Sequence, residues 1–258
     1  MGEKTAIGWT HHTYNPWWGC TRVSPGCENC YAETFAARNN VRWGVKAERK
    51  FFGEHHWMEP FAWDRKAQKD GVRRRVFCAS MADVFEDRPE LEGYRTALWF
   101  VIENTPHLDW LLLTKRPDNI TRLTPEAWRS GKCPTNVWLG ASVENQEWLS
   151  VRCIFLAEAK KELGARVSFL SLEPLLGGVN IGLWLQEDNE DWPYPPLDWV
   201  IVGAESGDGR RPFEIEWLGD VAEQCKGNAA LFVKQDSGRY PGNQGRIPDE
   251  LWIHEFPR

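Results

Sequence analysis

The sequence lacks any uninterrupted run of about eighteen apolar residues, the length that a transmembrane helix needs. Its first residues, Met-Gly-Glu-Lys-Thr, also lack the apolar stretch of a secretory signal peptide. Basic residues are not in excess, since 31 Lys and Arg stand against 37 Asp and Glu, a formal net charge of −6. These absences argue against a membrane-spanning helix and against binding of polyanions by bulk charge. They predict a cytoplasmic protein, in a compartment where thiols stay reduced.

The chain is long enough, at 258 residues, for one large α/β domain that buries a substantial core. Its 16 tryptophans are many, and large aromatic side chains usually fill cores. We predict a single domain over residues 1–258, with an aromatic-rich insertion at about 39–70 that covers the site. A tail at about 238–258, containing Pro, Gly and scattered apolar residues, is expected to pack back over the domain.

Apolar runs that end in polar residues recur along the chain, roughly every thirty residues from the second onward, which is the span of one βα unit. Continuous apolar strands are typical of a parallel sheet buried on both faces. We therefore predict an α/β fold with a partial or complete parallel (β/α) barrel, and a doubly wound open sheet as the alternative. The predicted strands, with their terminal turns, are 6–13, 75–83, 109–117, 136–145, 166–174, 198–207 and 230–235. The predicted helices are 31–38, 60–69, 90–104, 146–163 and 217–225.

Three cysteines, Cys20, Cys27 and Cys30, lie within eleven residues in the spacing C-x6-C-x2-C. The segment between the first two contains Ser-Pro-Gly, which bends a backbone readily and would let the sulfurs face one point. The motif follows the first predicted strand and precedes the first predicted helix, the place where α/β folds bind ligands. Three thiolates suit a [4Fe–4S] cluster with one iron left open for a small molecule.

Other interpretations of the cysteines remain open at this stage. A structural zinc ion wants four ligands, and His11, His12, His55 or His56 would supply the fourth. A disulfide fits poorly because nothing marks the chain as secreted. Burial as small apolar residues fits the remaining cysteines better than the closely spaced three. Those remaining cysteines are Cys78, Cys133, Cys153 and Cys225.

Taken together, short blocks across nearly the whole chain resemble the radical S-adenosylmethionine (SAM) superfamily, and most closely a phage- and prophage-encoded branch with a three-cysteine motif. The blocks are Asn15-Pro16-Trp17-Trp18-Gly19-Cys20, Cys27-Glu28-Asn29-Cys30-Tyr31, Ser80-Met81-Ala82-Asp83-Val84-Phe85, Leu112-Leu113-Thr114-Lys115-Arg116-Pro117, Gly140-Ala141-Ser142-Val143-Glu144-Asn145, Ser171-Leu172-Glu173-Pro174-Leu175, Val202-Gly203-Ala204-Glu205-Ser206-Gly207 and Phe232-Val233-Lys234-Gln235. The first cysteine gap is six residues, whereas the commonest pattern of the superfamily has three.

The resemblance implies a barrel of the radical SAM type with the cluster loop after its first strand. It implies a [4Fe–4S] cluster on Cys20, Cys27 and Cys30 whose open iron binds the amino and carboxylate groups of SAM. One-electron reduction by an external flavodoxin- or ferredoxin-like partner would cleave SAM to methionine and a 5′-deoxyadenosyl radical, which abstracts hydrogen from substrate.

The polar residues at the strand ends take roles from the same resemblance. The expected cofactor-binding residues are Ser80, Met81, Asp83, Ser142 and Glu144. The expected catalytic residues are Lys115, Glu173, Glu205 and Lys234. For each, a strand-end cap or an internal salt bridge is the competing structural interpretation.

The substrate expected from the branch is an amino acid attached to a modified thymine in phage DNA, or its free amino-acid precursor, with isomerisation as the reaction. The negative net charge argues mildly against tight binding to duplex DNA. The alternative function is a zinc-stabilised nucleic-acid-binding module without radical chemistry. A third hypothesis is a degenerate barrel that keeps its cluster only as a structural element.

Overall fold

Seven parallel strands form one open sheet in the computed structural model, which describes residues 5–187 and 191–258. Their order across the sheet is β1 (His12–Thr13), β4 (Arg74–Cys78), β5 (Leu108–Thr114), β6 (Val137–Ser142), β7 (Val167–Leu172), β8 (Trp199–Gly203) and β9 (Ala230–Gln235). Each strand lies beside the previous one in the chain, apart from the two short strands β2 (Trp17–Trp18) and β3 (Lys50–Phe51), which pair antiparallel in a separate sheet.

The seven-stranded sheet is strongly curled, and one tryptophan shows this. The ring of Trp9 lies 4.6 Å from that of Phe77 on β4 and 6.2 Å from that of Trp199 on β8. These strands are four places apart, about 19 Å in a flat sheet with a strand spacing of about 4.8 Å. A single side chain contacts both only because the sheet bends around it, so the architecture is a partial barrel.

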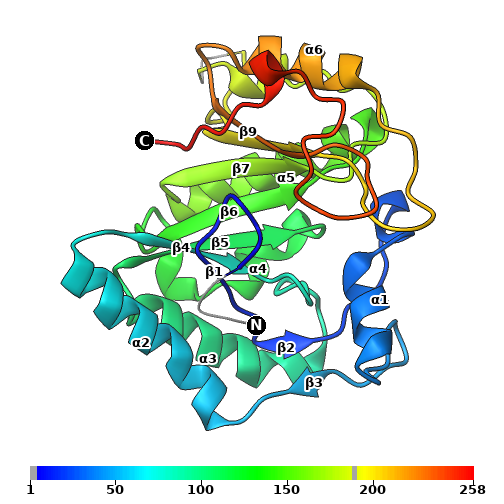
Figure 1. The fold of residues 1–258 in the computed structure, drawn as a ribbon. Coiled ribbons are helices and arrows are strands. Elements are labelled where there is room, and N and C mark those ends of the chain that lie inside the picture. Colours follow the sequence, from blue (N-terminus) through cyan, green and yellow to red (C-terminus); the bar gives the residue numbers. More distant parts are fainter. Residues whose placement is uncertain (1–4, 188–190) are drawn as a thin grey trace.

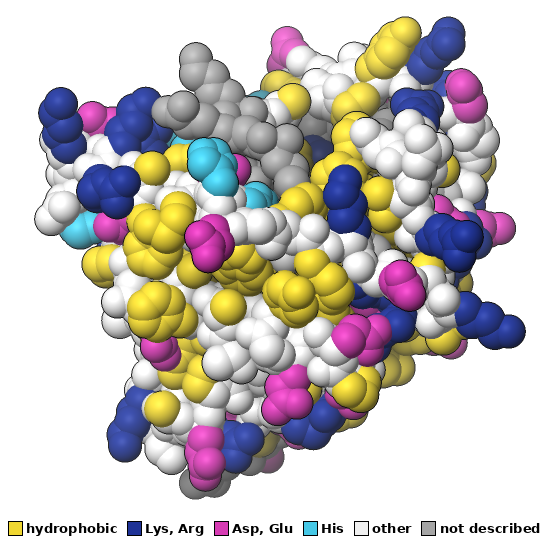
Figure 2. All heavy atoms as spheres, turned by 90° about the horizontal axis from the view of Figure 1, so that it is seen from below, with side chains coloured by type: hydrophobic (Ala, Val, Ile, Leu, Met, Phe, Trp, Pro, Cys, Tyr) yellow, Lys and Arg dark blue, Asp and Glu magenta, His cyan; other side chains and the backbone are white. Residues whose placement is uncertain are grey.

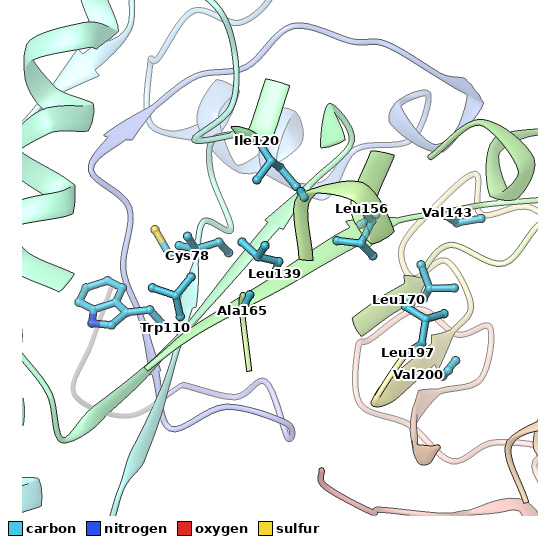
Figure 3. Packing of buried hydrophobic residues seen from close by; sticks show 14 of the residues in the cluster. Cys78, Trp110, Ile120, Leu139, Val143, Leu156, Ala165, Leu170, Leu197 and Val200 are labelled. Carbon is cyan, nitrogen blue, oxygen red and sulfur yellow. The ribbon is translucent and has the colours of Figure 1, made fainter. Parts of the chain in front are cut away.

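The helices cover the outer, convex face of the sheet (Figure 1). They are α2 (Glu54–Asp70), α3 (Glu92–Glu103), α4 (Ile120–Leu123), α5 (Gln146–Leu163) and α6 (Ile215–Cys225). Side chains that alternate along the strands point outward and form the larger core against these helices, as Figure 3 shows for Trp110, Leu139 and Leu170. The apolar runs in the sequence have this origin, because the inward side chains are apolar as well.

The inner, concave face carries a second core of large aromatic side chains. Phe169 on β7 lies directly over Gly140 on β6, where a Cβ atom would be 2.2 Å from the ring. The tail after β9 closes the amino end of this core, since Phe256 packs on the ring of Trp199 and under the guanidinium of Arg75. The prediction that the tail packs back over the domain agrees with these contacts.

The cysteine motif lies at the carboxyl ends of the strands. In Figure 1 the arrows of β5 and β6 point toward the side of the molecule that carries α1 (Tyr31–Arg38) and β2. The cysteines lie in the segment between β2 and α1. The predicted position of the motif, between the first strand and the first helix, is therefore confirmed, with the small strand β2 added.

The prediction of a partial parallel barrel with seven strands is confirmed. The predicted bounds agree completely for the helices at 31–38 and 146–163 and for the strand at 230–235. The first strand, expected at 6–13, is wrong over 6–11 because Trp9 turns into the inner core. At His11 the imidazole Nδ1 accepts a hydrogen bond from the backbone N–H of Arg75. In a regular strand a backbone carbonyl would accept that bond.

The insertion at 39–70 contains the predicted helix at 60–69, but that helix starts earlier than predicted. Helix α2 begins at Glu54 and contains Pro60 in its interior. Proline favours a first helical turn, which is why the sequence pointed to a start there. Tertiary packing extends the helix instead, since His56 stacks on Tyr14 at 4.6 Å between ring centroids. Helix α2 covers the convex side of the sheet. The loop before it reaches the segment that carries the cysteines, since the N–H of Gly44 donates to the carbonyl of Cys20 at 3.1 Å and Arg49 donates to the hydroxyl of Thr21 at 3.0 Å.

Charges of both signs are interspersed on the face that α2 and α3 form, which Figure 2 views. Two arginines of the run 73–75 are paired with carboxylates: Arg73 with Asp109 at 2.7 Å and Arg74 with Asp70 at 2.7 Å. Arg75 donates to the carbonyl of Trp9 and lies over the ring of Phe256. No helix within residues 5–187 and 191–258 is long and apolar enough to cross a membrane.

Candidate active site

The cysteine loop, defined here as residues 19–30, lies across the carboxyl ends of the parallel strands. Its three thiols are free and partly buried. The other four cysteines of the chain are fully buried in the outer core, as predicted. The closely spaced cysteines are thus separated from the structural ones by position as well as by spacing.

The end of β4 holds the start of the loop through Asn15. Its side chain accepts a hydrogen bond from the N–H of Met81 at 2.7 Å and donates one to the hydroxyl of Ser80 at 3.1 Å. The backbone continues this attachment, because the N–H of Gly19 donates to the carbonyl of Met81 at 2.9 Å. Tyr31, just beyond the last cysteine, donates its hydroxyl to the carbonyl of Ser80 at 2.9 Å. Ser80 and Met81, predicted to bind a cofactor, therefore also fix both ends of the loop.

The end of β5 holds the first cysteine through Arg116. Its guanidinium donates to the sulfur of Cys20 at 3.7 Å and to the carbonyl of Thr21 at 2.6 Å. The same group pairs with Asp83 at 2.8 Å, and Asp83 also accepts from the hydroxyl of Thr114 at 2.7 Å. The carboxylate of Asp83, predicted to bind the amino group of a cofactor, is thus committed to orienting an arginine.

A second buried ion pair supports the first. Arg49 and Glu86 are joined at 2.7 Å with almost no exposed surface. Arg49 also donates to the hydroxyl of Thr21 at 3.0 Å, and Glu86 lies 3.8 Å from Arg116. Two arginines and two carboxylates therefore form a neutral, buried network under the first part of the loop, which satisfies the requirement that buried charges be paired.

The ends of β6 and β8 hold the second part of the loop through two carboxylates. Glu144 is fully buried, pairs with Arg152 at 2.8 Å and accepts from the N–H of Gly26 at 3.2 Å. Glu205 accepts from the side-chain amide of Asn29 at 3.1 Å. Both were expected to contact ligands directly, as cofactor-binding and catalytic residues. Their contacts in the structure are instead with the cysteine loop and with arginines.

Arg211 completes the attachment at β8. Its side chain pairs with Glu205 and also with Glu28 of the loop, the latter at 3.1 Å. Burial would raise the pKa of Glu205, but hydrogen bonds from Arg211 and Asn29 outweigh it and lower that pKa. Glu205 is therefore ionised near neutral pH, the state in which it accepts all of these bonds.

The remaining predicted residues form a polar group on the concave side. The ammonium of Lys115 donates to the hydroxyl of Ser142 at 2.8 Å, and Ser142 donates to the carbonyl of Glu173 at 3.2 Å. The carboxylate of Glu173 pairs with Lys234 across the position of Gly203, where a Cβ atom would be 3.4 Å from both side chains. The structure thus brings together Lys115, Ser142, Glu173 and Lys234, from β5, β6, β7 and β9.

Burial and the neighbouring cations have opposite effects on the pKa values of the cysteine thiols. Burial raises the pKa of the Cys20 thiol to about 12; the charge of Asp83 adds to this increase, and Arg116 counteracts it. Burial likewise raises the pKa of Cys30, and the N–H groups of Glu33 and Ala32 and the charge of Lys115 counteract it. Cations are therefore placed beside two of the three sulfurs, where a thiolate bound to a metal would need them.

The donor set fits a cluster with three cysteine ligands, because three free thiols share one loop and cations lie beside them. The ligand geometry is not preformed: the described residues contain no group of three or more His, Cys, Asp or Glu side chains placed to hold a metal ion. Two of the four histidines considered for zinc have other contacts, since His11 accepts from the backbone N–H of Arg75 and His56 bonds the carbonyl of Asn15. A metal centre here requires the loop to draw its sulfurs together.

Reasoning from the sequence missed the residues that fasten the loop. Arg116 and Asn29 lie within the sequence blocks that carry the resemblance, but no contact with the cysteine loop was predicted for them, and Arg211 lies outside those blocks. No local signal pointed to Arg49, whose partner Thr21 lies 28 positions earlier in the sequence, or to Arg152, whose partner Glu144 lies on the other side of the start of α5.

Comparison with known proteins gives a family and a distant structural likeness. A family model described as "Protein of unknown function (DUF5131)" matches residues 4–249. No curated protein sequence matches the chain. Among solved structures, a spore photoproduct lyase mutant with bound AdoMet and dinucleoside spore photoproduct is 11% identical, with a TM-score of 0.46 over 95% of this chain and 59% of that one. Another mutant of that lyase is 12% identical, with a TM-score of 0.43 over 87% of this chain and 55% of that one. The chain thus spans less than two thirds of those two structures, and a likeness this distant says nothing about activity.

Proposed function

We propose an activity for this chain, which belongs to the DUF5131 family: it is a radical SAM enzyme with a [4Fe–4S] cluster on Cys20, Cys27 and Cys30. The observation that carries the proposal is the placement of three free thiols on one loop, fastened to the carboxyl ends of β4, β5, β6 and β8 of a parallel partial barrel. Parallel barrels build their reaction sites at this edge.

A cluster bound there would supply the electron that cleaves SAM, and the fragment produced would remove a hydrogen atom from substrate. The chain's own residues would bind and orient the cofactor. Lys115 has no carboxylate partner among the described residues, so its ammonium is placed to receive the carboxylate of SAM. Ser142 and the backbone carbonyls of Ser80 and Met81 would accept the remaining hydrogen bonds. Asp83 and Glu144 act by holding the loop.

The substrate side is assigned to Glu173 and Lys234, with Glu205 acting through the loop. A carboxylate and an ammonium side by side match the opposite charges of an α-amino acid. We therefore propose isomerisation of an amino acid, either free or joined to a modified thymine in phage DNA. The net charge of −6 and the pairing of Arg73 and Arg74 with carboxylates favour the free amino acid over a duplex.

The electron would come from an external flavodoxin- or ferredoxin-like reductant in the cytoplasm. The competing function is a zinc-stabilised nucleic-acid-binding module. It predicts one tetrahedral zinc ion and loss of folding on chelation.

The test is anaerobic reconstitution with iron and sulfide, followed by reduction and EPR spectroscopy with and without SAM. The proposal expects a [4Fe–4S]⁺ signal that changes when SAM is added. Cys27→Ala should lose the signal, whereas Cys133→Ala, at a core position that is 7% exposed, should keep it. Bound zinc, or a cluster that does not respond to SAM, would contradict the proposal. Mass spectrometry of free amino acids and of thymine-modified DNA after turnover then decides the substrate.

A further inference from the structure

One arginine connects the buried charge network to the first cysteine. Arg116 is only 12% exposed, and its two terminal nitrogens reach three acceptors: the carboxylate of Asp83, the sulfur of Cys20 and the carbonyl of Thr21. The two contacts with the loop fix the direction in which the Cys20 sulfur points. A guanidinium is suited to this role because its N–H groups have fixed directions.

The orientation of Arg116 is itself set by Asp83. That carboxylate accepts from the N–H groups of Phe85 at 3.0 Å and Lys115 at 3.1 Å, besides the hydroxyl of Thr114. With all of these donors in place it has one favourable orientation, and Arg116 pairs with it at 2.8 Å. Asp83 and the end of β5 therefore determine the position of the guanidinium, independently of the conformation of the cysteine loop.

We propose that Arg116 is the positioning residue that sets both the place of Cys20 and the reduction potential of the cluster bound to it. This inference rests on the proposed function, since a potential exists only if the cluster does. Burial and hydrogen bonding to the sulfurs are the protein's main means of tuning such clusters. Reduction adds one negative charge, and a positive charge with an N–H group on a ligand sulfur stabilises that charge in a site of low dielectric. Arg116 therefore raises the potential and eases the transfer of an electron from the reductant.

The experiment compares the wild type with Arg116→Met, Arg116→Lys and the control Arg122→Met. Arg122 is 54% exposed and pairs with Asp87, so its loss leaves the loop untouched. The potential is measured by EPR-monitored redox titration of each reconstituted protein. Hydrogen exchange of residues 19–23 is measured separately on the cluster-free proteins, which reports the position of the loop without any activity.

Arg116→Met should reduce the ratio of reduced to oxidised cluster at least tenfold at a fixed applied potential, a decrease of about 59 mV for one electron. Arg116→Lys, which keeps the charge but not the fork, should fall between it and the wild type. Exchange at residues 19–23 should become faster in both variants, and Arg122→Met should match the wild type in both measurements.

An unchanged potential in Arg116→Met with unchanged loop exchange would overturn the inference. If the wild type assembles no cluster, the proposed function is wrong, and so is the inference about the reduction potential. Hydrogen exchange of residues 19–23 then tests, by itself, whether Arg116 positions Cys20. If Arg116→Met shows no cooperative unfolding, Arg116→Lys decides: a wild-type potential and wild-type exchange in that variant would overturn the role of the fork.

Discussion

Glu144 shows, at the scale of the residue, why a carboxylate at a strand end is ambiguous in sequence. It follows an apolar strand, as a ligand-binding residue would, yet it is fully buried and bonded to Arg152 and Gly26. An unpaired carboxylate in that position would be costly, so the arginine eight positions later in the sequence is part of the same feature. Removing one partner of such a buried pair typically costs about 3–5 kcal/mol.

A glycine on β6 allows a sharp test of the inner core. Gly140→Ala should destabilise the protein by about 1–3 kcal/mol, because the added Cβ atom would lie 2.2 Å from the ring of Phe169. The control is Gly219→Ala in the interior of α6, where nothing lies within 4 Å of the new atom. That variant should gain about 0.5–1 kcal/mol from its better helix propensity. Denaturant unfolding measures the free energy of unfolding of both variants. A change of the same sign in both would contradict the close packing of Phe169 on Gly140.

The spacing of Cys20, Cys27 and Cys30 was visible in the sequence because all three lie within one loop. Their partners were not, since Arg116 reaches Cys20 from 96 positions away in the chain. Composition and periodicity report what a residue does locally, whereas a long-range hydrogen bond depends on how strands line up. The sequence therefore pointed to the thiols but not to the contacts that Asp83, Glu144 and Glu205 make with arginines and with the loop. The cofactor-binding and catalytic roles expected for these carboxylates stay predictions.

The cysteine loop, at the scale of the element, has its own fixed structure without regular secondary structure over most of its length. Its contacts are with the ends of β4, β5, β6 and β8, so strands in register place it. Strand β9 and helix α5 were predictable from their apolar patterns, and α5 begins with the side chain of Asn145 accepting from the N–H of Trp148. The start of helix α2 was not predictable, because it depends on packing against Tyr14 and not on a capping signal.

The part of the attachment at β8 that Asn29 makes can be removed on its own, with the pairing of Arg211 to Glu28 left in place. Asn29→Ala deletes hydrogen bonds to Glu205 at 3.1 Å and to the carbonyl of Gly209 at 3.0 Å. At about 0.5–1.5 kcal/mol for each bond, local opening of residues 26–30 should become roughly tenfold more frequent. Hydrogen exchange followed by mass spectrometry measures this effect, with global stability monitored by thermal unfolding.

The matched control is Asn104→Ala, which removes a side-chain bond to the carbonyl of Phe100 at the end of α3. It should leave exchange of residues 26–30 unchanged. If Asn29→Ala also leaves this exchange unchanged, the loop is held by its other attachments and Asn29 contributes nothing measurable.

The open sheet, at the scale of the whole molecule, depends on the segments that follow β9. The N–H of Asp236 bonds the carbonyl of Asn243, and its carboxylate accepts from the N–H groups of Ser237 at 2.6 Å and Arg246 at 2.8 Å. Further on, the chain pairs antiparallel with β9 at His254 and covers the amino end of the inner core. One buried carboxylate therefore anchors the return of the chain over the partial barrel.

This carboxylate should make stability depend on pH in a defined direction. Burial would raise the pKa of Asp236, but hydrogen bonds from Arg246 and Ser237 outweigh it and lower that pKa below its ordinary value. A lowered folded-state pKa contributes stability above the unfolded-state pKa, near about 3.9, and this contribution is lost as the pH falls through the folded-state value.

Asp236→Asn should therefore melt at a lower temperature than the wild type at pH 7, because its amide places N–H donors against N–H donors. The two proteins should begin to converge as the pH falls below about 4 and should meet once it has fallen through the lowered folded-state pKa, where the wild-type carboxylate is protonated in the folded protein as well. Thermal unfolding from pH 7 to pH 3 measures this difference, and a gap that stays constant across the range would show that the charge of Asp236 does not anchor the tail.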